Sequence, residues 1–205
     1  MAEVTALIDY GAGNLRSVAN ALRAAGAEGV VVTADPTVVR AADRIVLPGV
    51  GAFRACIQAL RGVPGLVEAM TERVQVGAAP FLGICVGMQL LATRGIEFGT
   101  TDGLDWIGGE VRQIPVTDSA IKVPHMGWND VAPHRNALIE PGEAYFLHSY
   151  HFVPDAGADI AAMTDHGGGL VAAVARDTVL GVQFHPEKSQ QYGLSLLARF
   201  LAWKP

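Results

Sequence analysis

The first hundred residues alternate short apolar runs with amphipathic segments, and this alternation constrains the fold more than any other feature. Residues 4–9 form an apolar run, and residues 14–26 then repeat leucine, valine and alanine at helical spacing after a glycine-rich turn. The same strand–turn–helix unit returns in residues 29–43, 44–60 and 80–93. Apolar strands that alternate with helices predict a parallel sheet covered by helices on both faces.

The pattern changes after about residue 100. Residues 107–185 contain short runs of β-branched and aromatic residues separated by tight turns, and residues 192–203 form an apolar helical segment. We therefore predict an α/β fold with a mostly parallel sheet and an antiparallel extension in the C-terminal half. Because no Pro/Ser/Gly-rich linker divides the chain, we expect its 205 residues to form a single domain, residues 1–205.

Charge and composition exclude several classes of function. The chain has 15 basic and 20 acidic residues, a net charge of −5, which argues against nucleic-acid or anionic-membrane binding. It contains no apolar run of about 18 residues, so we expect no membrane span. The N-terminal segment lacks the basic start and apolar centre of an export signal. We expect a cytoplasmic protein in which Cys56 and Cys85 are free thiols.

The segment around Cys85 is the sharpest local motif. Gly83-Ile84-Cys85-Val86-Gly87 lies between an apolar strand, residues 80–84, and a predicted helix over residues 86–93. This is the context of a nucleophile elbow, with cysteine as the nucleophile. Small residues two before and two after it make room for a sharp turn. The amides that begin the helix favour a thiolate, and the Val86 amide is placed to bind an oxyanion.

Taken alone, this motif fits a buried structural cysteine equally well, and Cys56 on its apolar helical face fits that reading better still. The segment Gln183-Phe184-His185-Pro186-Glu187 favours catalysis at Cys85. A thiol nucleophile needs a base, and the base needs an acceptor that orients it. His185 follows an apolar strand, Glu187 lies two residues further on, and Pro186 restricts the backbone between them.

The remaining polar and glycine-rich motifs indicate less. The turn Gly49-Val50-Gly51 fits the second half of an oxyanion hole, although the segment by itself favours an ordinary strand-to-helix turn. His148 and His151 suggest a metal site, but strand alternation would place them on opposite faces and no cysteine or carboxylate cluster completes the ligands. We therefore expect no metal and no cofactor.

These motifs together resemble the class I (triad) glutamine amidotransferases and, within them, the family of glutaminase subunits of imidazole glycerol phosphate synthase. Besides the cysteine and histidine segments, the matching motifs are Asp9-Tyr10-Gly11-Ala12-Gly13-Asn14, Pro48-Gly49-Val50-Gly51-Ala52-Phe53, Pro124-His125-Met126-Gly127-Trp128-Asn129, His148-Ser149-Tyr150 and Pro186-Glu187-Lys188-Ser189. They occur in the family's order over nearly the whole chain.

The resemblance implies that Cys85 attacks the side-chain amide of glutamine, that His185 carries the proton to the departing ammonia, and that Glu187 orients His185. It implies oxyanion contacts from Val50, Gly51 and Val86. It implies substrate contacts from Gly49, Gln89, Ser149 and Tyr150.

The resemblance also implies a heterodimer in which ammonia passes to a separate cyclase subunit with a (β/α)₈ barrel, for imidazole glycerol phosphate formation in histidine biosynthesis. Asn14, Trp128, Tyr145 and Lys188 match positions that the family directs toward that partner. As residues alone they read equally well as a helix N-cap, a core tryptophan, a sheet aromatic and a solvated lysine.

Two alternatives remain open at this level: a related triad hydrolase or peptidase, and a non-catalytic binding subunit whose triad is idle. The length favours a partner, because 205 residues hold one such domain and leave the chemistry that uses ammonia to another chain.

Overall fold

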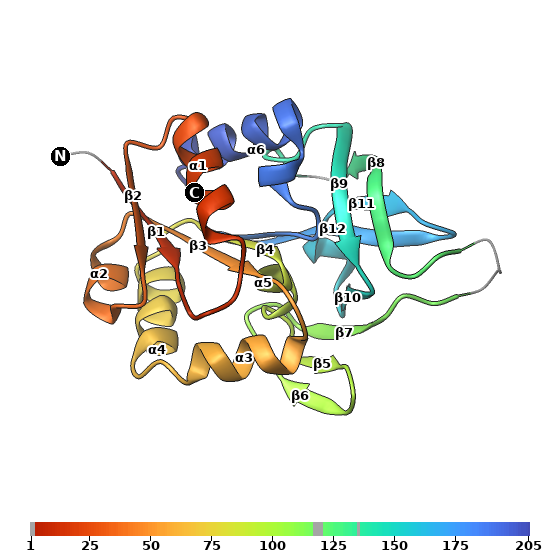
Figure 1. The fold of residues 1–205 in the computed structure, drawn as a ribbon, viewed down its shortest axis with the longest axis horizontal. Helices are drawn as coiled ribbons and strands as arrows, with labels where there is room; N and C mark the ends of the chain where they lie inside the picture. The colour runs from red at the N-terminus through yellow and green to blue at the C-terminus, as the bar shows by residue number, and fades with distance from the viewer. Residues whose placement is uncertain (1–2, 117–120, 135) are drawn as a thin grey trace.

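A nine-stranded sheet runs through the computed structural model, which describes residues 3–116, 121–134 and 136–205 (Figure 1). Its strand order is β2-β1-β3-β4-β13-β12-β11-β8-β9. The first five strands in this order are parallel, and most are apolar runs buried on both faces. They are β2 (Gly29–Thr33), β1 (Val4–Ile8), β3 (Arg44–Gly49), β4 (Phe81–Cys85) and β13 (Val179–Val182).

The other four strands continue the same sheet in antiparallel pairs, which confirms the predicted extension. They are β12 (Gly169–Arg176), β11 (Ile160–Asp165), β8 (His125–Pro133) and β9 (Gly142–His148). The long-range pairing of β13 beside β4 joins the two halves, because it brings a strand from the end of the chain next to the one that ends in Cys85.

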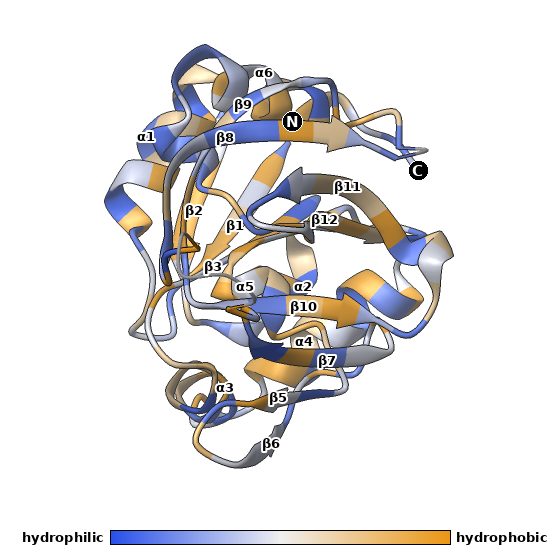
Figure 2. Cartoon of the chain, turned by 90° about the vertical axis from the view of Figure 1, so that its right-hand side faces the viewer, coloured by the Kyte–Doolittle hydropathy of each residue, from blue (hydrophilic) through white to orange (hydrophobic). Residues whose placement is uncertain are grey.

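A second sheet of four strands, in the order β10-β7-β5-β6, was not anticipated from the sequence (Figure 2). It consists of β10 (Tyr150–Pro154), β7 (Gly109–Gln113), β5 (Arg94–Ile96) and β6 (Thr100–Asp102). Strands β5 and β6 have three residues each, too few to show an alternating pattern. Residues 143–154, one of the runs of β-branched and aromatic residues in the C-terminal half, are divided at Ser149 in the structure. As a result, β9 and β10 belong to different sheets.

Helices cover both faces of the parallel half, as predicted (Figure 1). On one face α1 (Leu15–Ala24) contacts α6 (Gln190–Ala202), and on the other α4 (Leu66–Thr71) contacts α2 (Pro36–Ala41) and α3 (Phe53–Arg61). A π-helical turn, η1 (Glu72–Val76), continues α4, and 3₁₀ turns form η2 (Gly157–Asp159) and η3 (Pro186–Lys188). In the described ranges, no helix has the length and apolarity needed to cross a membrane.

The helix after Cys85 is shorter than predicted. Residues 86–93 suit a helix, but α5 is only Val86–Gln89. The reason is tertiary, because the Thr93 N–H, which a helix through residue 93 would direct to the Gln89 carbonyl, donates instead to the Gly109 carbonyl of β7 at 3.0 Å. The N–H groups of Leu91 and Ala92 bond three residues back, to the carbonyls of Met88 and Gln89, at 3.1 Å each.

Gly87 in α5 should tolerate no side chain. A Cβ atom at this position would lie 1.9 Å from the carbonyl oxygen of Leu47, whereas Gly157 has open space around it. We expect Gly87→Ala to lower the free energy of unfolding by about 3 kcal/mol through overpacking, and Gly157→Ala to leave it nearly unchanged. Chemical denaturation of the two variants measures this, and equal stabilities would contradict the packing described here.

Candidate active site

Three parallel strands that are adjacent in the sheet have their carboxyl ends side by side, and the segments that follow these ends form the site. In the parallel register Gly49 of β3 lies beside Cys85 of β4, and Val182 of β13 lies beside Ile84. Because parallel strands present their carboxyl ends together, the glycine turn after β3, the Cys85 elbow and the segment leading to His185 converge.

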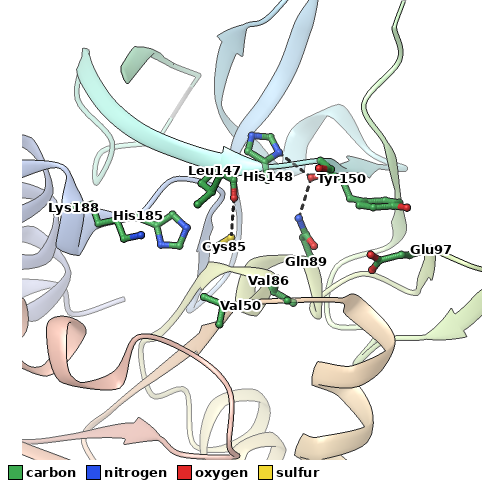
Figure 3. A pocket seen from close by; sticks show the side chains of 12 residues that line it. Val50, Cys85, Val86, Gln89, Glu97, Leu147, His148, Tyr150, His185 and Lys188 are labelled. Atoms are coloured by element: carbon green, nitrogen blue, oxygen red, sulfur yellow. Dashed lines mark hydrogen bonds between the residues drawn. The ribbon is translucent and has the colours of Figure 1, made fainter. Parts of the chain in front are cut away.

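Cys85 has the backbone conformation of a nucleophile elbow, with φ 55° and ψ −111°, which few non-glycine residues adopt. The flanking glycines are necessary, since a Cβ on Gly83 would lie 2.6 Å from the carbonyl oxygen of Gly87. The thiol is nearly buried, and its Sγ lies 4.0 Å from the Leu147 carbonyl oxygen (Figure 3). Because α5 has only four residues, its helix dipole is small, and its main contribution beside Cys85 is the N–H group of Val86.

His185 is held from both sides. Its Nδ1 lies 2.9 Å from Oε1 of Glu187, whose side chain is only 1% exposed. Its backbone N–H donates to the Tyr145 carbonyl at 2.9 Å, and the Ser189 hydroxyl donates to the His185 carbonyl at 2.7 Å. The imidazole orientation is therefore fixed by β9 and η3 as well as by Glu187.

The charge state of His185 results from two opposing effects. Burial lowers the pKa of the imidazole. Hydrogen bonds to Cys85 and Glu187 and the negative charges of both groups raise it by more than burial lowers it, so the pKa is about 9. A histidine that is protonated near neutral pH beside a thiol is suited to stabilise a thiolate and to donate a proton to a leaving amine.

A cavity of about 180 Å³ opens onto Cys85 (Figure 3). Nine of the residues singled out from the sequence line it: Val50, Gly51, Cys85, Val86, Gln89, Ser149, Tyr150, His185 and Lys188. Glu187 contacts His185 from outside the cavity. Gly49 packs beneath the elbow instead, where an added Cβ would lie 2.8 Å from the Gly87 nitrogen.

Two further lining residues, Glu97 and Leu147, were not singled out from the sequence, and His148 was named there only as a rejected metal ligand and in a family motif. Glu97 follows the short strand β5, and its Oε2 accepts the Phe53 N–H at the start of α3 at 2.7 Å. No motif marks it in the sequence. Leu147 directly precedes the His148-Ser149-Tyr150 motif, so its place beside that motif was the available signal.

The glycine turn after β3 is held by two side-chain donors. The Tyr10 hydroxyl donates to the Pro48 carbonyl at 2.8 Å, and the Cys56 thiol donates to the Val50 carbonyl at 3.3 Å. Burial raises the pKa of Cys56, which keeps this thiol protonated and able to donate. Gly51 has φ +98°, a conformation that favours glycine.

His148, which lines the cavity, leads into a row of contacting histidines that the sequence did not predict. Nδ1 of His148 lies 2.9 Å from the Tyr150 carbonyl oxygen, so this nitrogen carries the proton. Its Nε2 lies 3.1 Å from Nδ1 of His125, which also stacks on His166 with ring centroids 4.1 Å apart. Burial lowers the pKa of His148 to about 3 and that of His125 to about 4.

These histidines do not form a metal site. His148 ends β9 and His151 lies in β10. Because the two residues belong to different strands, the expectation that alternation along one strand would place them on opposite faces does not apply. Burial lowers the pKa of both rings and keeps them neutral. Among the described residues, no group of three or more His, Cys, Asp or Glu side chains is placed to hold a metal ion.

Three of the four residues predicted to face a partner contact one another. The Trp128 and Tyr145 rings pack edge to face with centroids 6.2 Å apart, and Lys188 Nζ lies 5.8 Å from the centre of the Tyr145 ring. Trp128 is 47% exposed, so it is not a core tryptophan. Asn14 precedes α1, which packs against η3, and its side chain makes no capping bond within the described residues.

Comparison with known proteins agrees with this fold. A family model described as "Glutamine amidotransferase class-I" matches residues 6–203. A solved structure titled "Crystal structure of glutamine amidotransferase" superposes with a TM-score of 0.75 at 19% identity, covering 97% of each chain. "Structure of PurLQS from Thermotoga maritima" gives 0.71 at 19% identity, covering 98% of this chain and 99% of that one. The chain belongs to the class-I glutamine amidotransferases and is an enzyme of that class.

More similar relatives narrow the assignment. The "Imidazole glycerol phosphate synthase subunit HisH" of Zymomonas mobilis is 58% identical over 204 residues, covering 98% of this chain and 96% of the relative. The protein of the same name from Rhodospirillum rubrum is 54% identical over 211 residues, covering 98% and 99%. Within the class-I enzymes, the chain belongs to the HisH family.

The raised pKa of His185 should appear as a dependence of stability on pH. A histidine whose pKa rises on folding contributes its full stabilisation at pH values below its pKa in the unfolded chain, about 6.5. This contribution is lost as the pH rises through the pKa of the histidine in the folded state. We expect the free energy of unfolding, relative to His185→Gln, to fall between pH 6.5 and about 9. NMR titration of the His185 ring should give a midpoint near 9, and a midpoint below 6.5 would contradict this assignment.

Proposed function

We propose that this amidotransferase hydrolyses glutamine to glutamate and ammonia with Cys85, His185 and Glu187, and that it passes the ammonia to a partner subunit. The main observation behind the proposal is that the Cys85 thiol and the hydrogen-bonded pair of His185 and Glu187 lie together at one small cavity. The cavity suits a free amino acid better than a polypeptide, which argues against a peptidase.

The geometry supports the following reaction. The Cys85 thiolate adds to the side-chain carbonyl carbon of glutamine, forming a C–S bond. Protonated His185 then donates its proton to the amide nitrogen, the C–N bond breaks, and ammonia leaves a γ-glutamyl thioester. Water attacks the thioester while His185 accepts a proton from it, and glutamate departs with return of the thiolate. Glu187 keeps the imidazole oriented and favours its charged form in both halves.

The negative oxygen of each tetrahedral intermediate requires hydrogen-bond donors. We assign this role to the Val86 amide and to the Val50-Gly51 turn, both of which line the cavity beside Cys85. We assign binding of the substrate's amino-acid end to Gln89, Ser149 and Tyr150. Glu97, the carboxylate among the described lining residues, complements the α-ammonium group of glutamine.

The outer face of the β8–β9 hairpin suits a partner subunit at the cavity mouth. Met126 pairs with Leu147 and Trp128 with Tyr145, so these four side chains share one face. Met126 is 65%, Trp128 47% and Leu147 37% exposed, and Leu147 also lines the cavity. An exposed apolar patch of this kind marks an interaction surface. A docked subunit would receive ammonia before water protonates it.

We infer that this partner is the cyclase subunit, with a (β/α)₈ barrel, that forms imidazole glycerol phosphate in histidine biosynthesis. The support is the name that the relatives carry, which describes a subunit of that synthase. The contacts expected from this chain are Trp128, Tyr145, Lys188 and Asn14. We expect the pair to act in the cytoplasm.

Loss of the nucleophile should abolish glutamine hydrolysis without loss of the fold. We expect Cys85→Ala to lower turnover by at least about 10³-fold, since a covalent mechanism cannot proceed without its nucleophile. A glutamine analogue carrying a diazoketone should label Cys85 and spare buried Cys56, as mass spectrometry of the peptides would show. Full turnover by Cys85→Ala would refute the mechanism, and an idle triad would give neither turnover nor labelling in the native chain.

The hairpin face should determine partner affinity. We expect Trp128→Ala to weaken binding of the cyclase subunit by roughly 30-fold, because a half-exposed tryptophan at an interface is typically a dominant contact. Val76→Ala, at an equally apolar exposed position in η1, is the matched control. Calorimetric titration measures both, with glutamate release expected to increase on adding the cyclase and its ligand. Equal affinities for the two variants would place the interface elsewhere.

A further inference from the structure

The side chain of Gln183 bridges the substrate wall and the nucleophile. Gln183 is fully buried and lies between β13 and His185. Its Oε1 accepts from Nε2 of Gln89 at 3.0 Å, and its own Nε2 lies 3.7 Å from the Cys85 sulfur. Its backbone N–H donates to the Ala172 carbonyl at 2.8 Å, which fixes the residue to β12.

The amide orientations follow from one backbone carbonyl. The Tyr150 oxygen can only accept, so the Gln89 group 3.0 Å from it must be the nitrogen (Figure 3). That same nitrogen donates its second hydrogen toward Gln183, so the facing atom of Gln183 must be the oxygen. The Gln183 nitrogen is thereby turned toward Cys85, and the direction of this hydrogen bond is set by the network.

We propose that Gln183 is a further residue of the catalytic machinery, whose amide donates a hydrogen bond to the Cys85 sulfur and stabilises its thiolate form. The inference rests on the proposed function, in which Cys85 is the nucleophile. A neutral donor aimed at a sulfur favours the anion over the thiol, because a hydrogen bond to a charged acceptor is the stronger one. His185 supplies the opposite charge, and Gln183 fixes the direction in which the sulfur points.

The contact acts on the chemical steps rather than on substrate binding. The thiolate is the attacking group when the C–S bond forms and the leaving group when water hydrolyses the thioester, so its stabilisation matters in both halves. Gln183 is not among the described residues that line the cavity, whereas Gln89 is. Loss of the donor should therefore lower kcat, whereas a change in KM would report loss of the contact that holds Gln89.

Replacing the amide tests this in the complete chain. The rate of Cys85 alkylation by iodoacetamide is measured from pH 5 to 10, together with glutamine kinetics. In Gln183→Met, which keeps the length and removes the donor, we expect alkylation at pH 7 to slow about tenfold and its pH profile to move to higher pH. Gln183→Glu, nearly isosteric, should move the profile further, because its carboxylate repels the thiolate. Gln191→Met, an exposed glutamine in α6, is the control.

The outcomes separate the alternatives. An unmoved alkylation profile with a raised KM in both variants would overturn the inference, since Gln183 would then only hold Gln89 in place. If Gln183→Met does not fold, Gln183→Glu decides the question alone, because its shape and packing are retained. If Cys85 of the unaltered chain shows no enhanced alkylation over Cys56, the proposed function itself fails.

Discussion

The site depends on the close packing of the β3, β4 and α5 backbones. Cys85 adopts a left-handed conformation, and α5 turns so sharply after it that Gly87 lies against the Leu47 carbonyl, where a Cβ would have only 1.9 Å. This contact fixes where the thiol emerges. The glycine turn after β3 and the segment to His185 are then placed by ordinary strand register, because both belong to strands adjacent to β4.

Burial affects the histidines in opposite ways, depending on their partners. In His125, His148 and His151 burial lowers the pKa to about 4 or below, so their rings are neutral, and hydrogen bonds fix the tautomers of His125 and His148. His185 is also buried, but Cys85 and Glu187 raise its pKa to about 9. The environment thus keeps positive charge beside the Cys85 sulfur, whereas His148, which also lines the cavity, stays neutral.

The proposed catalytic site and the proposed partner surface share the β9 strand. The inward-facing His148 joins the hydrogen-bonded wall, whereas Tyr145 and Leu147 face outward with Trp128 and Met126. The same strand holds His185 through the Tyr145 carbonyl. A subunit docked on the outer face would therefore press on the element that orients the catalytic base, which gives a direct physical route from partner binding to glutamine hydrolysis.

The sequence alone determined the parallel half of the sheet, the Cys85 elbow and the nearness of Glu187 to His185. Each depends on local rules: apolar runs require burial on both faces, only glycine fits beside the elbow, and Pro186 restricts a two-residue spacing. Tertiary structure decided the rest, because it arises between segments far apart in the chain. The Gly109 carbonyl of β7 took the Thr93 N–H and ended α5 early, β5 brought Glu97 to the cavity, and the pairing of β13 with β4 placed Gln183 against the sulfur. Spacing along the sequence does not record such contacts.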